Sequence, residues 1–460
     1  MALLIAAVGG VLFESAFAFP RSHIVAAGLV AVAVVILIIG VRQLPIFWHP
    51  WGSARRGLRA MAELALYLSP IAMLSVAYPI ASRQVEGEGI GGVPLTTLLL
   101  AASVTVPWLT QAVCLPLYRA VAQHMAAGEH DKIVERLCEV WPVTFVQCLP
   151  VAVLFAVPIE LSMHWSASAL GTYLALCVLY LAFAQSLILS IIFRRRGLWA
   201  LAWAGVAAAL LVAPTLWFLP PLVGLVTQLA PLRKHWRVLT QPLGLHYVGV
   251  ANDILRGLLL GAVLWSDKYF LFLKAGDRFA VTSVNLALLP AVLAYNNYFV
   301  RLAPRFDASI LALRRAMEEA HYHVLVRRSR TVYRLVTLSL WRSAVVGAGI
   351  AVVVTAYAAI GHPHSLALVA AVAVSSWLAM MITLLCYQLD YIGQSGVAEW
   401  FSAVYLVGCA ATFVFFPLGA APYVGLIALD VLLFVLTLRI TLSHWRSPEF
   451  SLFWRHATAW

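Results

Sequence analysis

Long apolar stretches separated by short polar breaks run through the whole sequence. A helix that crosses the hydrocarbon core of a bilayer needs about 20 predominantly apolar residues. By that criterion the pattern predicts an all-α fold, a polytopic bundle of membrane-spanning helices. The candidate spans lie near 2–19, 24–41, 62–82, 94–117, 141–159, 168–192, 198–213, 215–232, 247–272, 279–300, 335–360, 366–388, 397–417 and 422–440.

The stretch 198–232 leaves the number of crossings open, because it is interrupted only at Ala213-Pro214-Thr215. Basic clusters flank it at 194–196 and at 233–237. If both clusters lie on the same side of the membrane, the chain crosses an even number of times between them. Two short helices satisfy this condition, and so does one re-entrant hairpin.

Arg and Lys are distributed unevenly between the two sets of loops. Alternating crossings place 23 of the 31 basic residues on one side and only Arg21, Arg83, Lys274 and Arg278 on the other. Loops rich in Arg and Lys stay in the cytoplasm. The pattern therefore predicts a multi-pass protein with both termini cytoplasmic and with cytoplasmic basic tracts at 42–61, 119–139, 194–196, 233–237, 301–334 and 441–460.

Composition supports the membrane assignment. The chain is 63% hydrophobic and 11% charged, whereas soluble domains carry about 25% charged residues. The net charge of +12 is spread over short tracts between apolar segments, so no contiguous basic surface for nucleic acid is predicted. The six cysteines lie in or beside apolar stretches and are expected to be buried thiols.

Catalytic motifs are missing from the sequence. It contains no G-x-S-x-G, no G-x-x-x-x-G-K-[ST], no H-E-x-x-H and no C-x-x-C. His321 with His323, and His362 with His364, come nearest to a metal-binding pattern, but no cysteine lies near them in sequence. We interpret them as interfacial polar residues. The sequence predicts no enzyme activity, no cofactor and no metal.

Ionisable residues within the spans are more informative, because a charge in hydrocarbon is costly unless it faces protein or water. Asp267 and Lys268 are adjacent, and Arg256 lies eleven residues before Asp267, which places the two about 20° apart on one helix face. Two interpretations stay open: a polar lining of a substrate path, or charges that fix the packing of neighbouring helices. Further candidates for the path are Asn285, Asn296, Asp390, Glu399 and Asp430.

An amphipathic tract follows a span in each half of the chain, at 119–139 and at 301–334. This positional repeat predicts about 12 core helices in two six-helix lobes, 62–245 and 246–460, after an N-terminal extension, 1–61, with two further candidate spans. Arginine-rich amphipathic tracts bind either anionic lipid headgroups or protein partners. The candidate docking residues are Arg314, Arg315, Arg327 and Arg328.

The order of these features resembles a known family over roughly residues 62–460. The chain is similar to the PelG family of Pel exopolysaccharide transporters, within the multidrug/oligosaccharidyl-lipid/polysaccharide flippase superfamily. Asp267-Lys268, flanked by aromatic residues, is the sharpest point of the likeness. The segments that carry it are Tyr118-Arg119 through Glu129-His130-Asp131, Leu264-Trp265-Ser266-Asp267-Lys268-Tyr269-Phe270, Leu311 to Glu319, Cys386-Tyr387-Gln388-Leu389-Asp390 and Pro448-Glu449-Phe450-Ser451-Leu452-Phe453-Trp454-Arg455.

The resemblance implies export of a biofilm exopolysaccharide across the bacterial inner membrane. It also implies two kinds of partner, a cytoplasmic glycosyltransferase and other Pel-type membrane subunits. Pel-type polymer is rich in amino sugars and partly cationic. Acidic residues on its path, Asp267 foremost, would attract a passing ammonium group at low dielectric.

Two alternatives to a polysaccharide exporter remain at this stage. The first is an ion-coupled antiporter of small cationic compounds, similar to the MATE transporters of the same superfamily. The second is a membrane scaffold of a polysaccharide synthase complex that transports nothing. A scaffold has little reason to bury Arg256, Asp267, Lys268 and Asp430 in its spans, so we expect a transporter.

Overall fold

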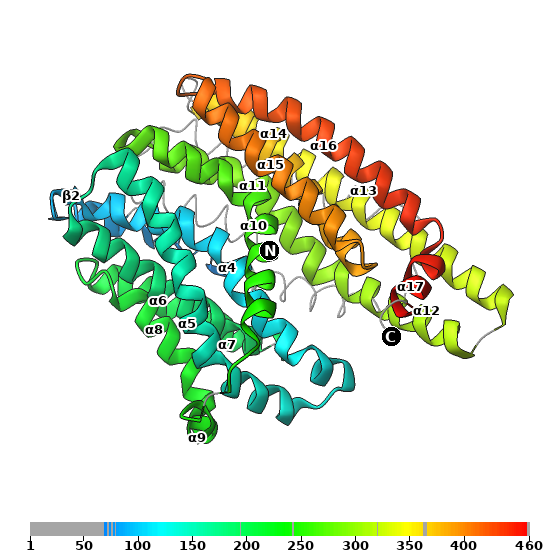
Figure 1. The fold of residues 1–460 in the computed structure, drawn as a ribbon. Coiled ribbons are helices and arrows are strands. Elements are labelled where there is room, and N and C mark those ends of the chain that lie inside the picture. The colour runs from blue at the N-terminus through cyan, green and yellow to red at the C-terminus, as the bar shows by residue number, and fades with distance from the viewer. Residues whose placement is uncertain are drawn as a thin grey trace, which may run out of the picture. The chain divides into compact units, whose positions relative to one another are not determined.

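The computed structural model describes most of the chain after residue 68 (Figure 1). The predicted spans 2–19 and 24–41, and with them the extension 1–61, lie outside the described residues. Of the predicted span 62–82, the described part is helical. The described ranges are 69–70, 73–74, 77–78, 80–193, 195–241, 243–319, 321–361 and 366–457.

The described chain divides into two compact units, residues 69–279 and residues 280–457. The sequence division at 245/246 assigns the helix after residue 246 to the second lobe. In the structure that helix packs on helices of the first unit, so the first unit continues to Phe279.

The first unit is helical apart from one short hairpin. The strands Gly89–Ile90 (β1) and Val93–Pro94 (β2) pair antiparallel. The α-helices are α4 (Leu95–Ala127), α5 (His130–Met163), α6 (Ala167–Ile192), α7 (Arg196–Val212), α8 (Leu219–Leu229), α9 (Trp236–Leu239) and α10 (Tyr247–Ala275). Short 3-10 turns cover Ala230–His235 and Gly276–Arg278.

Helices α4 and α5 reach well past their apolar segments and meet at a tight turn. Gly128 ends α4 with φ 71°, a left-handed conformation that glycine adopts without a steric penalty. Glu129 then accepts hydrogen bonds from Lys132 at 2.9 Å and from His124 at 2.8 Å. These bonds, that to Lys132 first, lower the pKa of Glu129. The predicted tract 119–139 is therefore the turn of a helical hairpin.

The stretch 198–232 forms two short helices, α7 and α8, which pack against each other. At 1.5 Å per residue, α7 is about 25 Å long and α8 about 16 Å. Together with the 3-10 turn that follows it, α8 extends for about 28 Å. The break that separates the two helices falls at 213–218, where the sequence has Pro214.

The second unit, over its described residues, consists of helices joined by short turns. Its central helix is α14, which packs against α11, α13, α15 and α16 and is buried along most of its length. The elements are α11 (Val281–Asn297), a π-helical turn (Tyr298–Leu302), α12 (Ala303–Glu319), α13 (Tyr322–Gly361), α14 (Leu366–Tyr391), α15 (Ser395–Phe415), α16 (Ala421–Trp445) and α17 (Pro448–Ala457).

Among the described residues, eight helices are long and apolar enough to cross a membrane. The prediction of an all-α polytopic membrane bundle is confirmed, and the β1–β2 hairpin is a small addition to it. The six cysteines are buried, as expected. The eight helices are α4, α5, α6, α10, α13, α14, α15 and α16.

Candidate functional site: buried polar groups within the spans

Helix α10 packs closely against α4 through two glycines one turn apart. A Cβ atom at Gly257 would lie 2.5 Å from Ala112 Cα, and one at Gly261 would lie 2.8 Å from the Trp108 carbonyl oxygen. Small residues at this spacing let two membrane helices approach until their backbones touch. Since higher numbers on α10 meet lower numbers on α4, the two helices run antiparallel.

Aromatic side chains fasten α10 to both α4 and α5. Trp108 Nε1 donates a hydrogen bond to the Leu258 carbonyl at 2.8 Å, and the Tyr269 hydroxyl donates one to the Phe155 carbonyl at 2.6 Å. The rings of Trp108, Phe155 and Tyr269 pack edge to face, with centroids 4.7 to 5.7 Å apart. These contacts fix the position of the α10 segment that carries Asp267 and Lys268.

Asp267 and Lys268 form an ion pair in the interior of the first unit. Lys268 Nζ lies 2.9 Å from Asp267 Oδ1, and each side chain is about 1% exposed. Lys268 also donates a hydrogen bond to the Leu264 carbonyl at 3.1 Å. It lies eleven residues after Gly257, which places it on the helix face that contacts α4. Asp267 lies about 100° around the helix from that face.

A second ion pair on α10 lies near its N-terminal end, where Asp253 binds Arg119 of α4. Asp253 is 6% exposed and the Arg119 side chain is half-exposed. Arg256 is half-buried and lies about 16 Å from Asp267 along the helix axis. The Arg119–Asp253 pair was not predictable from the sequence, because it depends on how α4 packs against α10.

The second unit has its own buried carboxylate, Asp430 of α16, which is 0% exposed. Its Oδ2 accepts a hydrogen bond from the hydroxyl of Ser375 on α14 at 2.8 Å. Ser375 was not among the predicted residues, although two consecutive serines in an otherwise apolar span, Ser375 and Ser376, are a recognisable signal.

Asp267 and Asp430 both lie well inside their helices. Asp430 and Ser375 each lie nine residues, or about 14 Å, from the N-terminal end of their own helix. Asp267 lies eight residues, or about 12 Å, from the C-terminal end of α10. In a hydrocarbon core about 30 Å thick, these depths are close to the midplane. Ionisable groups at that depth are costly and usually serve a function.

The remaining residues predicted for the path lie on helices other than α10 and α16, which carry Asp267 and Asp430. Asn285 is exposed on α11, and Asn296, near the end of the same helix, is half-buried. Asp390, at the end of α14, and Glu399, in α15, are half-buried. All four belong to the second unit, and their assignment to a path stays a prediction.

The residues predicted for partner docking lie on α12 and on the N-terminal part of α13. Arg315, Arg327 and Arg328 are exposed, and Arg314 is half-buried. The predicted tract 301–334 is thus two helices that form a hairpin rather than one continuous amphipathic stretch. In the described part of the chain, no three His, Cys, Asp or Glu side chains come together in a way that could hold a metal ion.

No family model matches the sequence, and no curated protein matches it. Among solved structures, the chain is similar to an inward-facing multidrug resistance MATE family transporter of the MOP superfamily. The two are 12% identical, with a TM-score of 0.42, over 90% of this chain and 99% of that one.

Proposed function

We propose that the protein exports a polysaccharide, Pel-like in character, from the cytoplasm across the inner membrane. The observation that carries the proposal is the buried ionisable pair Asp267–Lys268 within the candidate span α10, which α4 and α5 hold in place. Burying two charges there is justified in a transporter, where the segment lies on or next to a hydrated path. The resemblance on residues 264–270 supplies the substrate class.

A cationic, amino-sugar-rich polymer fits the acidic residues of the spans. The proposal assigns Asp267 and Asp430 to the path, because a carboxylate in a medium of low dielectric attracts an ammonium group strongly. Arg256, Asn285, Asn296, Asp390 and Glu399 are the further polar residues that it assigns there. A cytoplasmic glycosyltransferase would deliver the growing polymer, together with other Pel-type membrane subunits.

One observation favours a second candidate, an ion-coupled antiporter of small cations. Asp430 lies at 0% exposure with a neutral hydroxyl, that of Ser375, as a hydrogen-bond partner. Carboxylates within membrane spans are typical of the proton and ion pathways of coupled transporters. The two candidates differ in substrate rather than in the membrane architecture that they need.

The test is made in cells that produce the polymer and lack this chain. Reintroducing the native chain should restore secreted polysaccharide, measured with an amino-sugar-specific lectin. An antiporter would instead restore efflux of a small cationic dye without affecting polymer. If the native chain restores neither activity while the synthase complex still assembles, the scaffold function remains. If a chain in which both Asp267 and Asp430 are replaced by Asn still restores secreted polymer, the path assignment is refuted.

A further inference from the structure

Helix α13 is twice as long as a membrane crossing requires. Its 40 residues extend for about 60 Å, whereas the hydrocarbon core is about 30 Å thick. Residues 343–361 carry no charge and would span about 28 Å. Trp341, which is 61% exposed, and Arg342 directly precede them, as is usual at a membrane interface. The first nineteen residues of α13, 322–340, therefore continue outside the hydrocarbon.

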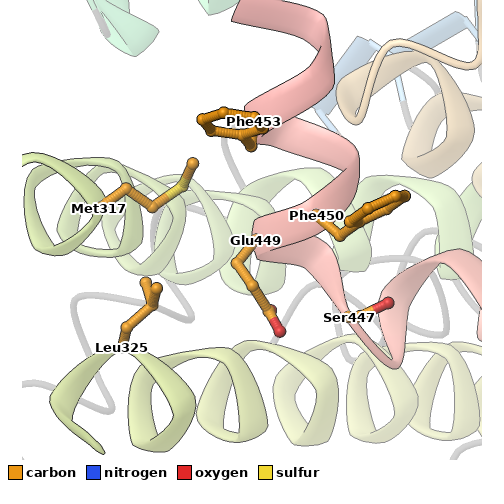
Figure 2. A pocket seen from close by; sticks show the side chains of 6 residues that line it. All are labelled: Met317, Leu325, Ser447, Glu449, Phe450 and Phe453. Atoms are coloured by element: carbon orange, nitrogen blue, oxygen red, sulfur yellow. The ribbon is translucent and has the colours of Figure 1, made fainter. Parts of the chain in front are cut away.

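Helix α12 packs along this outer part of α13, and α17 lies against it (Figure 1). The three helices surround a groove of about 470 Å³. Figure 2 shows Met317 and Phe453 facing each other across it, with Leu325 pointing into it. Ser447, Glu449 and Phe450 complete the lining.

The groove lies beyond the reach of the lipid headgroups. Leu325 precedes Arg342 by seventeen residues, or about 25 Å along α13. Each headgroup layer is only about 5–8 Å thick, and a helix tilt of about 20° shortens the 25 Å by less than about 2 Å. On the predicted topology the groove faces the cytoplasm, where an occupant has to be soluble.

The groove is apolar, and its surroundings are basic. Phe450 is 61% exposed and Phe453 is 56% exposed, and exposed aromatic side chains next to a groove are typical of protein interaction sites. Exposed arginines lie on the two helices beside it. They are Arg305 and Arg315 on α12 and Arg327, Arg328, Arg330 and Arg334 on α13.

Glu449 is the acidic residue among those that line the groove. Its Oε2 is buried, and within the described part of the chain it has no hydrogen-bond partner. A buried carboxylate oxygen without a donor is unfavourable. An occupant that supplies a donor, such as a lysine or an amide, removes this deficit.

We propose that this groove binds an acidic amphipathic helix of a soluble cytoplasmic protein. Its apolar face fills the space between Met317, Leu325 and Phe453, as in other helix-in-groove complexes. Its acidic residues pair with the arginines of α12 and α13, and one donor reaches Glu449. The inference depends on the topology of α13 and not on the substance transported.

The test uses the full chain in its native membrane, with the photo-reactive amino acid benzoylphenylalanine in place of Phe453. Irradiation should attach it to a protein segment that mass spectrometry identifies as acidic and amphipathic, with a lysine, arginine or amide within one turn of its anchoring residues. The same substitution at Val414, a residue 73% exposed in the span α15, should attach only to lipid. Transport is not measured, so failure of this test leaves the proposed function standing.

Charge reversal tests the role of the arginines. R327E/R328E should lower the yield of the adduct about tenfold, because the exposed Arg328 lies about 60° around α13 from Leu325, which lines the groove, and charges beside a binding site contribute mainly to attraction between partners. R327K/R328K should retain it. The matched control is R233E/K234E, a pair of adjacent exposed basic residues in the first unit, which should change nothing. R328E alone provides a second reversal if the double variant does not fold.

Several results would overturn the proposal. They are the absence of an adduct at Phe453, an adduct only with lipid or only with a second copy of this chain, and a protein segment without acidic residues. An equal loss of adduct in R233E/K234E would also overturn it, because the charges of the hairpin would then have no special role.

Discussion

The hydroxyl of Ser375 on α14 donates a hydrogen bond to Asp430 Oδ2 on α16 across 2.8 Å, and both side chains are 0% exposed. We expect Ser375→Ala to lower the free energy of unfolding by about 1–3 kcal/mol, because it removes a donor from a buried carboxylate. Thermal unfolding in detergent measures the change.

Ser376 provides the matched control for this prediction. It is 1% exposed, and within the described residues its Oγ has no hydrogen-bond partner. Ser376→Ala should therefore leave the melting temperature unchanged or raise it. If the two alanine variants melt alike, the Ser375–Asp430 hydrogen bond does not stabilise the second unit.

The close crossing of α4 and α10 gives a steric prediction. Gly257→Ala would place a Cβ atom 2.5 Å from Ala112 Cα, a backbone atom that cannot turn aside. We expect the helices to separate, with a loss of about 1–3 kcal/mol. Gly249→Ala in the same helix has no atom within 4 Å of the new Cβ and should be neutral or slightly stabilising. Equal melting temperatures would contradict the close contact.

The apolar pattern predicts the membrane-embedded part of the helices well and their outer ends poorly. The span 168–192 corresponds to Ala167–Ile192, and 366–388 to Leu366–Tyr391. The span 335–360, however, belongs to a helix that begins thirteen residues earlier, at Tyr322. Charged residues such as Arg327 and Arg330 are stable in a helix once it has left the hydrocarbon. Because this outer part of the helix is not apolar, a search for apolar stretches does not detect it.

The candidate site was likewise predictable only in part from the sequence. Asp267 and Lys268 were predictable because an ionisable residue in an apolar stretch stands out in the sequence. The hydrogen bond of Asp430 with Ser375, and the ion pair of Asp253 with Arg119, join residues 55 and 134 positions apart. Such pairs depend on which helix faces overlap, and one sequence does not specify that overlap.

Topology can be tested with introduced cysteines, because all six native ones are buried. Thr331 is exposed in the arginine-rich part of α13, whereas its neighbour Ser329 is only 3% exposed and would not report access. Thr331→Cys should resist a membrane-impermeant thiol reagent in intact cells and react after permeabilisation, since the tract is predicted to be cytoplasmic. Glu88→Cys, exposed in the turn before β1, should react in intact cells. The opposite labelling pattern would show that the predicted orientation in the membrane is inverted.

The last prediction concerns Asp267 and Lys268, which the structure pairs at 2.9 Å with about 1% exposure each. Removing one partner of a buried ion pair costs about 3–5 kcal/mol, because the remaining charge loses the attraction that offset its removal from water. Asp267→Asn and Lys268→Met should therefore each lower the melting temperature in detergent. A fall in export by either single variant would not by itself place the residue on the path.

The double variant Asp267→Asn/Lys268→Met separates the two interpretations. Replacing both partners of a buried ion pair is often neutral or stabilising, so the double variant should melt near the native chain and above either single variant. If the pair only fixes packing, secreted polymer should recover together with stability. We expect stability to recover and export to stay low, because a neutral pair no longer attracts a cationic polymer. Full recovery of both would show that the pair is structural, and a double variant as unstable as the single ones would mean that the two charges do not stabilise each other.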